Sequence, residues 1–384
     1  MIPALALSRT FQRFFESEKA GGVVLLACTV IAIALANSAA GAGYAAFLHT
    51  KVAGLTVEHW VNDGLMAIFF LFVGLELERE LYVGELSNVR TALLPTFAAM
   101  GGIAVPVALH MSLNAGTPTQ GGAGIAMATD IAFALGVLAL LGSRAPASLK
   151  VFLTALAVMD DLGAVIAIAI FYSHGLAWGW LAAALATFAL LVVLNRLRVM
   201  KLWPYLLGGV LMWFCMLKSG VHATIAGVML AFAIPFSARA EDEASPSHRL
   251  EHFLHRPVAF FVLPVFALAN AGIVIGAGWS DALWSPNGTG ILAGLVLGKP
   301  LGIVLATFLA VWLGVSELPG DLRWRHVIGA GLLGGIGFTM SIFIANLAFP
   351  GQADLVNSSK TAILVASLGA GALGFSWLRF ARAP

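Results

Sequence analysis

Residues 149–172 read LKVFLTALAVMDDLGAVIAIAIFY, an apolar run interrupted near its middle by two adjacent carboxylates, Asp160 and Asp161. The run is long enough for a helix to cross a bilayer, which takes roughly 20 apolar residues. An ionised side chain near the membrane centre costs about 3 kcal/mol or more, and two neighbouring acids also repel each other. The run therefore predicts a membrane helix whose aspartates bind a cation or a proton. The alternative is that each acid merely pairs with a neighbouring side chain.

The composition of the whole chain agrees with a membrane protein. Of its 384 residues, 60% are hydrophobic and 10% are charged, and the mean hydropathy is +0.94. Soluble domains contain about 25% charged residues. We therefore expect residues 1–384 to form a single all-α, polytopic membrane domain. Two cysteines, Cys28 and Cys215, lie in apolar runs and give neither a metal-binding spacing nor a disulfide framework.

The apolar pattern predicts about 12 transmembrane helices. The pair at 203–218 and 221–236 is short, but the placement of nearby basic residues favours two crossings rather than one. The predicted spans are 21–40, 58–78, 92–113, 121–142, 149–172, 176–195, 203–218, 221–236, 254–275, 289–313, 326–349 and 360–380.

The distribution of basic residues sets the orientation of these spans. With 12 spans, 17 of the 21 Lys and Arg residues fall on the side of the two chain ends. The opposite side carries Lys51, Lys218 and Lys360, and Lys299 lies within a span. Because basic residues concentrate on the cytoplasmic side of membrane proteins, both termini are predicted to be cytoplasmic. On the other side, residues 44–57 alternate loosely and predict an extracytoplasmic β-hairpin, with an unstructured loop as the alternative.

The fourth and eleventh spans are interrupted by polar or small residues in comparable places. The fourth has Thr129 and Asp130 near its middle, and the eleventh contains Gly334, Gly335 and Gly337. Glycine in a membrane helix often serves only to allow close packing. An opened helix, however, presents dipole ends that can offset a fixed charge or coordinate a cation.

The positions of the two interrupted spans suggest an internal repeat. Spans 3–5 (about 92–172) and spans 10–12 (about 289–380) have similar lengths, and seven spans separate corresponding members. Seven is odd, so the second triplet enters the membrane from the opposite side. Inverted repeats with paired broken helices predict a binding site near the bilayer midplane. The remaining helices would then form an interface or scaffold.

The sequence resembles the NhaA-type sodium/proton antiporters of bacteria over nearly its whole length, from about residue 10 to residue 380. Several motifs carry the resemblance and occur in order along the chain. They are NDGLMAIFFLFVGLELERE (62–80), ATDIAFALGVLALLGSR (128–144), AVMDDLGAVIAI (157–168), KSGVHATIAGV (218–228), RLEHFLH (249–255), LPVFALANAG (263–272), LGKPLGI (297–303) and GIGFTMSIFIA (335–345).

The resemblance implies a 12-helix fold in which the broken fourth and eleventh helices cross. It implies electrogenic, pH-regulated exchange of cytoplasmic Na⁺ or Li⁺ for external H⁺, which serves sodium and pH homeostasis. It further implies a homodimer in the inner membrane of a bacterial cell, in contact with lipid, with the hairpin helping to join the protomers. No redox or organic cofactor and no nucleic-acid partner are expected.

Elementary chemistry supports the same activity. A hard cation such as Na⁺ prefers oxygen ligands, and a proton binds the same carboxylates, so a site that holds either ion but not both couples the two fluxes. Burial raises the pKa of a carboxyl group, which allows it to exchange protons near cytoplasmic pH. We expect Asp161 to be the principal cation ligand and Asp160 to be a second essential acid. Thr129 and Asp130 are predicted to supply an oxygen or to compensate helix dipoles, unless they only cap a helix.

Lys299 is the basic residue that lies deepest within a predicted span. A lysine near a helix end could extend toward the membrane surface instead, but apolar or small residues flank Lys299 on both sides. We expect Lys299 to pair with Asp160.

A second set of titratable residues lies near the predicted helix ends. The resemblance links the cytoplasmic part of this set to pH activation and His222 to the pH response, whereas Asp63 could line an ion pathway. Lysine is common in the family where this chain has Glu78, which makes the cytoplasmic group more acidic. Solvated surface charge is the alternative for the cytoplasmic residues, and a structural role is the alternative for His222. The set comprises Asp63, Glu76, Glu78, Arg79, Glu80, His222, Glu251, His252 and His255.

Three other classes of membrane protein fit the sequence less well. An intramembrane aspartyl protease would need a GxGD motif within the membrane, and the spans contain none. A prenyltransferase would need a DDxxD-type motif, and DDLGAV at 160–165 lacks the third acid. A passive cation channel is closer, but paired broken helices and an intramembrane lysine fit a carrier better. Saturable cation flux with protons in counterflow distinguishes the carrier from the channel.

Overall fold

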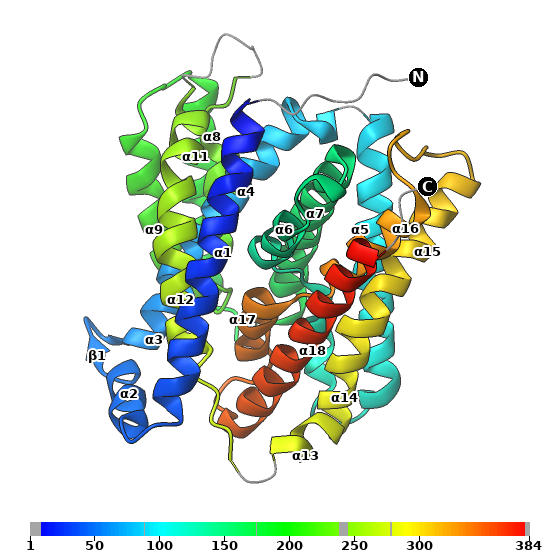
Figure 1. Ribbon diagram of the computed structural model, residues 1–384. Helices are drawn as coiled ribbons and strands as arrows, with labels where there is room; N and C mark the ends of the chain where they lie inside the picture. Colours follow the sequence, from blue (N-terminus) through cyan, green and yellow to red (C-terminus); the bar gives the residue numbers. More distant parts are fainter. Residues whose placement is uncertain (1–8, 88, 174, 238–244, 277–278, 381–384) are drawn as a thin grey trace.

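The computed structural model describes residues 9–87, 89–173, 175–237, 245–276 and 279–380, and within these it is a bundle of helices (Figure 1). Eight of its helices are long and apolar enough to cross a membrane, or up to ten if each of two bent helix pairs counts as one span. The chain is therefore an all-α, multi-pass membrane protein. Its first and last residues, whose cytoplasmic location the sequence predicts, lie outside the described ranges.

The elements follow one another in the order of the predicted spans. The first half consists of α1 (Arg9–Ala36), α2 (Gly41–Leu48), α3 (Val57–His59), η1 (Trp60–Leu65), α4 (Met66–Tyr82), η2 (Glu85–Ser87), α5 (Val89–Asn114), η3 (Gln120–Met127), α6 (Ile131–Leu140), η4 (Gly142–Arg144), α7 (Ala147–Phe171), α8 (Trp178–Arg196) and α9 (Trp203–Ser219). The second half consists of α10 (Ile225–Ala233), α11 (Pro246–Pro257), η5 (Val258–Val262), α12 (Leu263–Asn270), α13 (Trp279–Trp284), α14 (Pro286–Ala293), η6 (Gly294–Gly298), α15 (Lys299–Trp312), α16 (Trp324–Gly334), α17 (Phe338–Ala348) and α18 (Ala353–Phe380).

Several boundaries differ from the predicted spans because hydropathy does not define helix ends. The ninth predicted span, 254–275, is helical from Pro246 to Asn270, and the chain after Asn270 has no regular secondary structure. The twelfth begins at Ala353, seven residues early, since the polar first turns of α18 are helical too. The doubtful pair 203–218 and 221–236 appears as α9 and the nine-residue α10, both shorter than the eight helical stretches that are long and apolar enough to cross a membrane.

A short hairpin lies at one end of the bundle, beside α2 and α3 (Figure 1). Strands β1 (Lys51–Val52) and β2 (Leu55–Thr56) pair antiparallel, with Lys51 opposite Thr56 and Val52 opposite Leu55. Its turn contains Ala53 and Gly54, both at positive φ. The strands are shorter than the predicted range 44–57, because the apolar residues before them extend α2 to Leu48. We call this end of the molecule the hairpin end.

Two segments are broken inside the bundle. Between η3 and α6 the backbone at Ala128 and Asp130 is extended. Between α16 and α17 the break covers residues 335–337, and the two helices differ in direction by 45°. Both breaks are deeply buried, so their free backbone groups must find partners inside the protein. These partners build the site described next.

Candidate functional site

The two breaks are bonded directly to each other. The backbone N–H of Asp130 donates to the carbonyl oxygen of Ile336 at 2.6 Å. The Thr129 hydroxyl lies 2.9 Å from the carbonyl oxygen of Gly334, the last residue of α16. Segments more than 200 residues apart in sequence therefore form one unit at the centre of the molecule.

Asp130 occupies the beginnings of two helices at once. One carboxylate oxygen accepts a hydrogen bond from the backbone N–H of Phe133 at 3.1 Å and caps α6. The other accepts from the backbone N–H of Thr339 at 3.0 Å and also from the Thr339 hydroxyl. Because helix N-termini carry partial positive charge, this placement offsets both of them. Dipole compensation thus describes the contacts of Asp130 better than direct cation binding does.

The opposite helix ends are satisfied by Lys299 and Thr129. The Lys299 ammonium donates to the carbonyl oxygen of Met127, the last residue of η3. It also lies 2.6 Å from Oδ2 of Asp160, and neither side chain is exposed. The same Asp160 oxygen accepts a hydrogen bond from the Thr129 hydroxyl at 2.7 Å. Lys299, Asp160 and Thr129 therefore form one buried polar cluster, as the expected pairing of Lys299 with Asp160 requires.

Asp160 and Asp161 both have an oxygen without a protein partner. Their Oδ1 atoms are buried and make no hydrogen bond to any described residue. Asp161 is 2% exposed, and because successive helix residues point about 100° apart, it faces away from the contacts of Asp160. A buried carboxylate oxygen without a donor is costly unless a proton or a cation binds it. The two Oδ1 atoms are therefore where an ion could bind.

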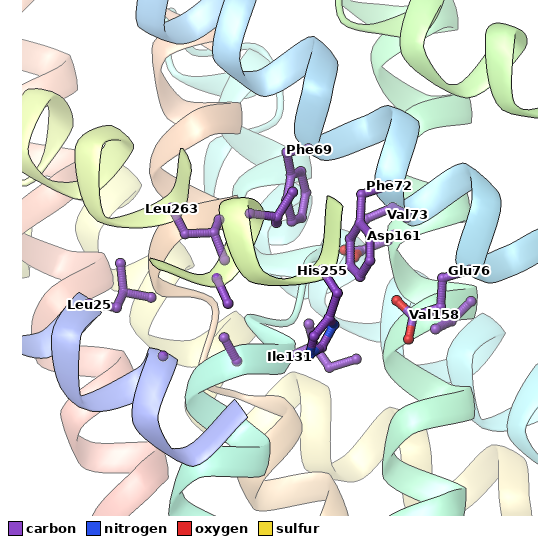
Figure 2. A pocket seen from close by; sticks show the side chains of 14 residues that line it. Leu25, Phe69, Phe72, Val73, Glu76, Ile131, Val158, Asp161, His255 and Leu263 are labelled. Atoms are coloured by element: carbon purple, nitrogen blue, oxygen red, sulfur yellow. The ribbon is translucent and has the colours of Figure 1, made fainter. Parts of the chain in front are cut away.

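Asp161 borders a small cavity of about 30 Å³, near the size of one water molecule (Figure 2). Phe69, Val73 and Glu76 of α4 line it on one side, and His255 of α11 lines it on another. The cavity connects the central aspartate with residues of the predicted cytoplasmic group.

The group predicted to be cytoplasmic is organised around Arg79. Its guanidinium bonds to Glu251 at 2.7 Å and to Glu80 at 2.9 Å, and it lies 3.9 Å from Glu76. Glu78 is 5% exposed and accepts a hydrogen bond from the Ser247 hydroxyl at 2.9 Å. His252, by contrast, is exposed. The structure thus brings four carboxylates together near one arginine and leaves His252 outside the cluster.

Asp63 and His222 lie elsewhere. Both line a cavity of about 1290 Å³ at the hairpin end, on the other side of the bundle from Arg79. The His222 Nε2 is 2.9 Å from the carbonyl oxygen of Tyr172, and Asp63 is half-buried. The residues predicted for pH response and pathway therefore fall into two separate places.

The glycines of the eleventh predicted span are needed because they have no side chain, and not because their backbone conformation requires glycine. Gly335 and Gly337 have φ of −70° and −91°, which any residue can adopt. A Cβ on Gly335 would overlap the carbonyl oxygen of Leu295, and one on Gly337 would overlap the Ser341 side chain. A Cβ on Gly334 would press against Ile303, near Lys299 and Thr129. Small residues at these positions let the break approach its neighbours.

The sequence analysis does not predict the role of two residues in this unit. Thr339 binds Asp130, and the Ser341 hydroxyl donates to the carbonyl oxygen of Ile125 at 2.6 Å. Both lie in the motif 335–345, but a Thr or Ser in a membrane helix usually bonds to its own preceding turn. Their position directly after the glycine cluster is the feature of the sequence that could have predicted bonds across the break.

The comparisons with known proteins agree with this geometry. The family model described as Na⁺/H⁺ antiporter 1 matches residues 12–378. A protein of Dechloromonas aromatica named Na(+)/H(+) antiporter NhaA is 69% identical over 375 residues, which cover 97% of this chain and 96% of that protein. Proteins with the same name from Cytophaga hutchinsonii and Mesorhizobium japonicum are 56% and 51% identical, over 98% and 97% of this chain and 96% and 95% of theirs.

Proposed function

Because this chain belongs to the Na⁺/H⁺ antiporter 1 family and exchanges Na⁺ for H⁺ across a membrane, we propose that the two ions compete for Asp161. The single observation that carries the proposal is the pair of buried Oδ1 atoms on Asp160 and Asp161 without a protein donor. A cation needs such oxygens, and a proton neutralises them equally well. Asp161 is the principal ligand, Asp160 the second acid, and the Thr129 hydroxyl supplies a further oxygen. Neither an organic nor a redox cofactor is needed.

Lys299 gives the exchange its charge balance. With Asp161 protonated and Asp160 and Lys299 ionised, the proton-loaded trio is neutral. Once Na⁺ has replaced the protons of Asp161 and Lys299, the trio and its Na⁺ carry a net charge of −1. If Na⁺ displaces a proton from Asp161 and also breaks the Asp160–Lys299 pair, Lys299 releases a second proton. Two protons would then move for each Na⁺, so exchange is electrogenic and the membrane potential drives it.

Access alternates between the two sides by motion of a core against a scaffold. The core comprises the repeats at about 92–172 and 289–380, related by inverted topology, with their broken spans crossing at Asp130. The remaining helices form the scaffold, in a total of 12 spans that include the short α9 and α10. The bonds between the two breaks support a core that moves as one body.

The cellular setting follows from charge placement and family. We place the protein in the inner membrane of a bacterial cell, with both termini cytoplasmic and the hairpin end outside. It exports Na⁺ or Li⁺ in exchange for external H⁺ and works as a homodimer whose hairpins help to join the protomers in the lipid. The carboxylates around Arg79 regulate activity with cytoplasmic pH.

Transport by the purified protein in vesicles tests the proposal. We expect Na⁺ or Li⁺ added to one side to drive protons in the opposite direction, with saturation, and K⁺ to be ineffective. Asp161→Asn protein, prepared in parallel, should insert normally and show no exchange. Cation flux that does not saturate and moves no protons would favour a channel and reject the proposal.

A further inference from the structure

The large cavity at the hairpin end and the small cavity at Asp161 are separated by aromatic side chains. Phe343 of α17 lines the large cavity, and Phe69 of α4 lines the small one. Phe70 bridges them, with its ring centroid 5.6 Å from that of Phe343 and 5.3 Å from that of Phe69. All three rings are at most 4% exposed. An ion moving between the two cavities would have to displace this wall.

A chain of three asparagines lies on the hairpin-end side of the wall. Asn270 donates from Nδ2 to Oδ1 of Asn62 at 2.8 Å, and its own Oδ1 accepts from Nδ2 of Asn346 at 2.6 Å. The second Nδ2 hydrogen of Asn270 goes to the carbonyl oxygen of Phe266 at 3.1 Å. Asn270 is fully buried. Both hydrogens of its Nδ2 are donated, and its Oδ1 accepts one hydrogen bond. We call Asn62, Asn270 and Asn346 the asparagine chain.

The asparagine chain and the aromatic wall come from the same three parts of the fold. Asn62 precedes α4, which carries Phe70, and Asn270 ends α12, which carries Phe266. Asn346 lies one turn beyond Phe343 on α17, and the rings of Phe266 and Phe343 are 6.3 Å apart. The three asparagines therefore lie on the hairpin-end side of the phenylalanine rings. Both sets of side chains join α17 to α12 and to the segment that contains α4.

A second asparagine side chain connects the second repeat to the segment that follows α12. The side chain of Asn357 on α18 pairs with the backbone of Val274, accepting from its N–H at 3.1 Å and donating to its carbonyl at 3.2 Å. Val274 belongs to the connector that follows α12. Two helices of the second repeat at the hairpin end, α17 and α18, are thus tied to the α12 side by asparagine amides.

We propose that the asparagine chain is a latch that holds the hairpin-end route to Asp161 closed. This inference rests on the alternating access proposed above, in which α17 moves relative to α4 and α12. Opening toward the hairpin end breaks the Asn346–Asn270 bond and then parts the aromatic wall. The latch contains no titratable group, in contrast to the carboxylates around Arg79. Asp63, which follows Asn62, and His222 are titratable and line the same cavity as Asn62 and Asn346. Opening of the latch responds to the ions bound at the centre.

Asn346 is the position at which to weaken the latch. It is half-buried, so Asn346→Ala removes the bond without leaving a large internal cavity. Loss of one amide hydrogen bond shifts a two-state equilibrium by about three- to tenfold. Asn195→Ala is the matched control. Asn195 of α8 donates to the carbonyl oxygen of Ala233 within the scaffold, and this bond does not join the scaffold to α17 or α18. Asn357→Ala, at the second fastening, gives an independent variant.

The readout is the accessibility of a cysteine behind the wall. Met340 lies one helical turn from Phe343 toward the break and is 2% exposed. In protein with Cys28 and Cys215 replaced by serine, Met340→Cys is labelled with a membrane-impermeant, positively charged methanethiosulfonate added at the hairpin side of vesicles. We expect Asn346→Ala and Asn357→Ala to speed labelling about three- to tenfold and Asn195→Ala to leave it unchanged.

Two results would overturn the latch. One is an unchanged labelling rate in both Asn346→Ala and Asn357→Ala, and the other is an equal acceleration in the control Asn195→Ala. Sodium-driven proton movement, measured in the same vesicles, separates the latch from the proposed function. Absent exchange with accelerated labelling rejects the antiport mechanism and keeps the latch, whereas normal exchange with unchanged labelling does the reverse.

Discussion

The ammonium group of Lys299 lies 2.6 Å from Oδ2 of Asp160, and both side chains are completely buried. A buried ion pair is costly to form, yet removing one partner is costlier still because the other charge remains. Asp161, the next residue, lies about 100° around the helix and has no comparable partner among the described residues. The two adjacent acids therefore have different environments, and their substitutions should have different effects.

Asp161→Asn should abolish Na⁺-driven proton movement while the protein still folds and inserts. The amide keeps the size of the side chain but cannot accept a proton or bind Na⁺ with a full charge. Proton uptake into vesicles measures the loss, and size-exclusion chromatography of the purified variant controls for folding. Exchange at the normal rate would remove Asp161 from the ion pathway.

Asp160→Asn should lower the free energy of unfolding by about 3 kcal/mol, more than Asp161→Asn does, because it leaves Lys299 without its carboxylate. Thermal unfolding of both variants in the same detergent gives the comparison. The Asp160→Asn/Lys299→Gln double variant should recover part of the loss, since no charge is then left unpaired. Equal destabilisation by the two single aspartate variants would contradict the pairing.

The apparent affinity for Na⁺ should fall as the pH falls. If a proton and Na⁺ compete for Asp161, the Na⁺ concentration for half-maximal rate rises toward tenfold per pH unit for each competing proton, in the range where the acid is mostly protonated. Initial rates at several Na⁺ concentrations and pH values provide the measurement. A half-saturating concentration that stays constant while the maximal rate changes would indicate a separate regulatory site.

Lys299→Gln, where still active, should exchange one proton per Na⁺ and lose its response to membrane potential. The reason is that the proposed second proton leaves from Lys299, and a glutamine side chain has no such proton to release. Transport in vesicles with the potential clamped by K⁺ and valinomycin tests this expectation. Voltage sensitivity equal to that of the wild type would leave Lys299 only the role of holding Asp160 and the Met127 carbonyl.

Glu78→Gln should raise the Na⁺ concentration for half-maximal rate, because it removes one of four carboxylates that attract cations around Arg79. The difference from wild type should shrink when choline chloride raises the ionic strength and screens the cluster. Ser247→Ala should change the half-saturating concentration in the same direction but less, since it removes only the hydrogen bond that stabilises the Glu78 carboxylate. A Glu78→Gln effect that is insensitive to salt would point to packing instead of charge.

The sequence predicted the ionisable residues of the site better than it predicted their bonding partners. Asp160, Asp161 and Lys299 stand out because a charge in an apolar run has few explanations, and the structure indeed brings Asp160 and Lys299 together. Thr339 did not stand out, since its partner Asp130 lies 209 residues away and nothing local marks the bond. The early start of α18 and the helix at α2 were missed for a related reason. Hydropathy reports solvent preference, whereas helix ends depend on turns and caps.

The bridge from Asp130 to Thr339 also sets the order in which the molecule can be completed. Asp130 is synthesised 209 residues before Thr339 and enters the membrane with only the α6 half of its partners. Until α17 arrives, that carboxylate and the open backbone beside it remain exposed to lipid, to water or to the insertion machinery. A nascent chain that stops before Trp324 is thus left with an unfinished interior rather than a smaller stable protein. Assembly of the protein thus ends in a late step, in which the segment from Trp324 onward completes the bonds of the break at Asp130.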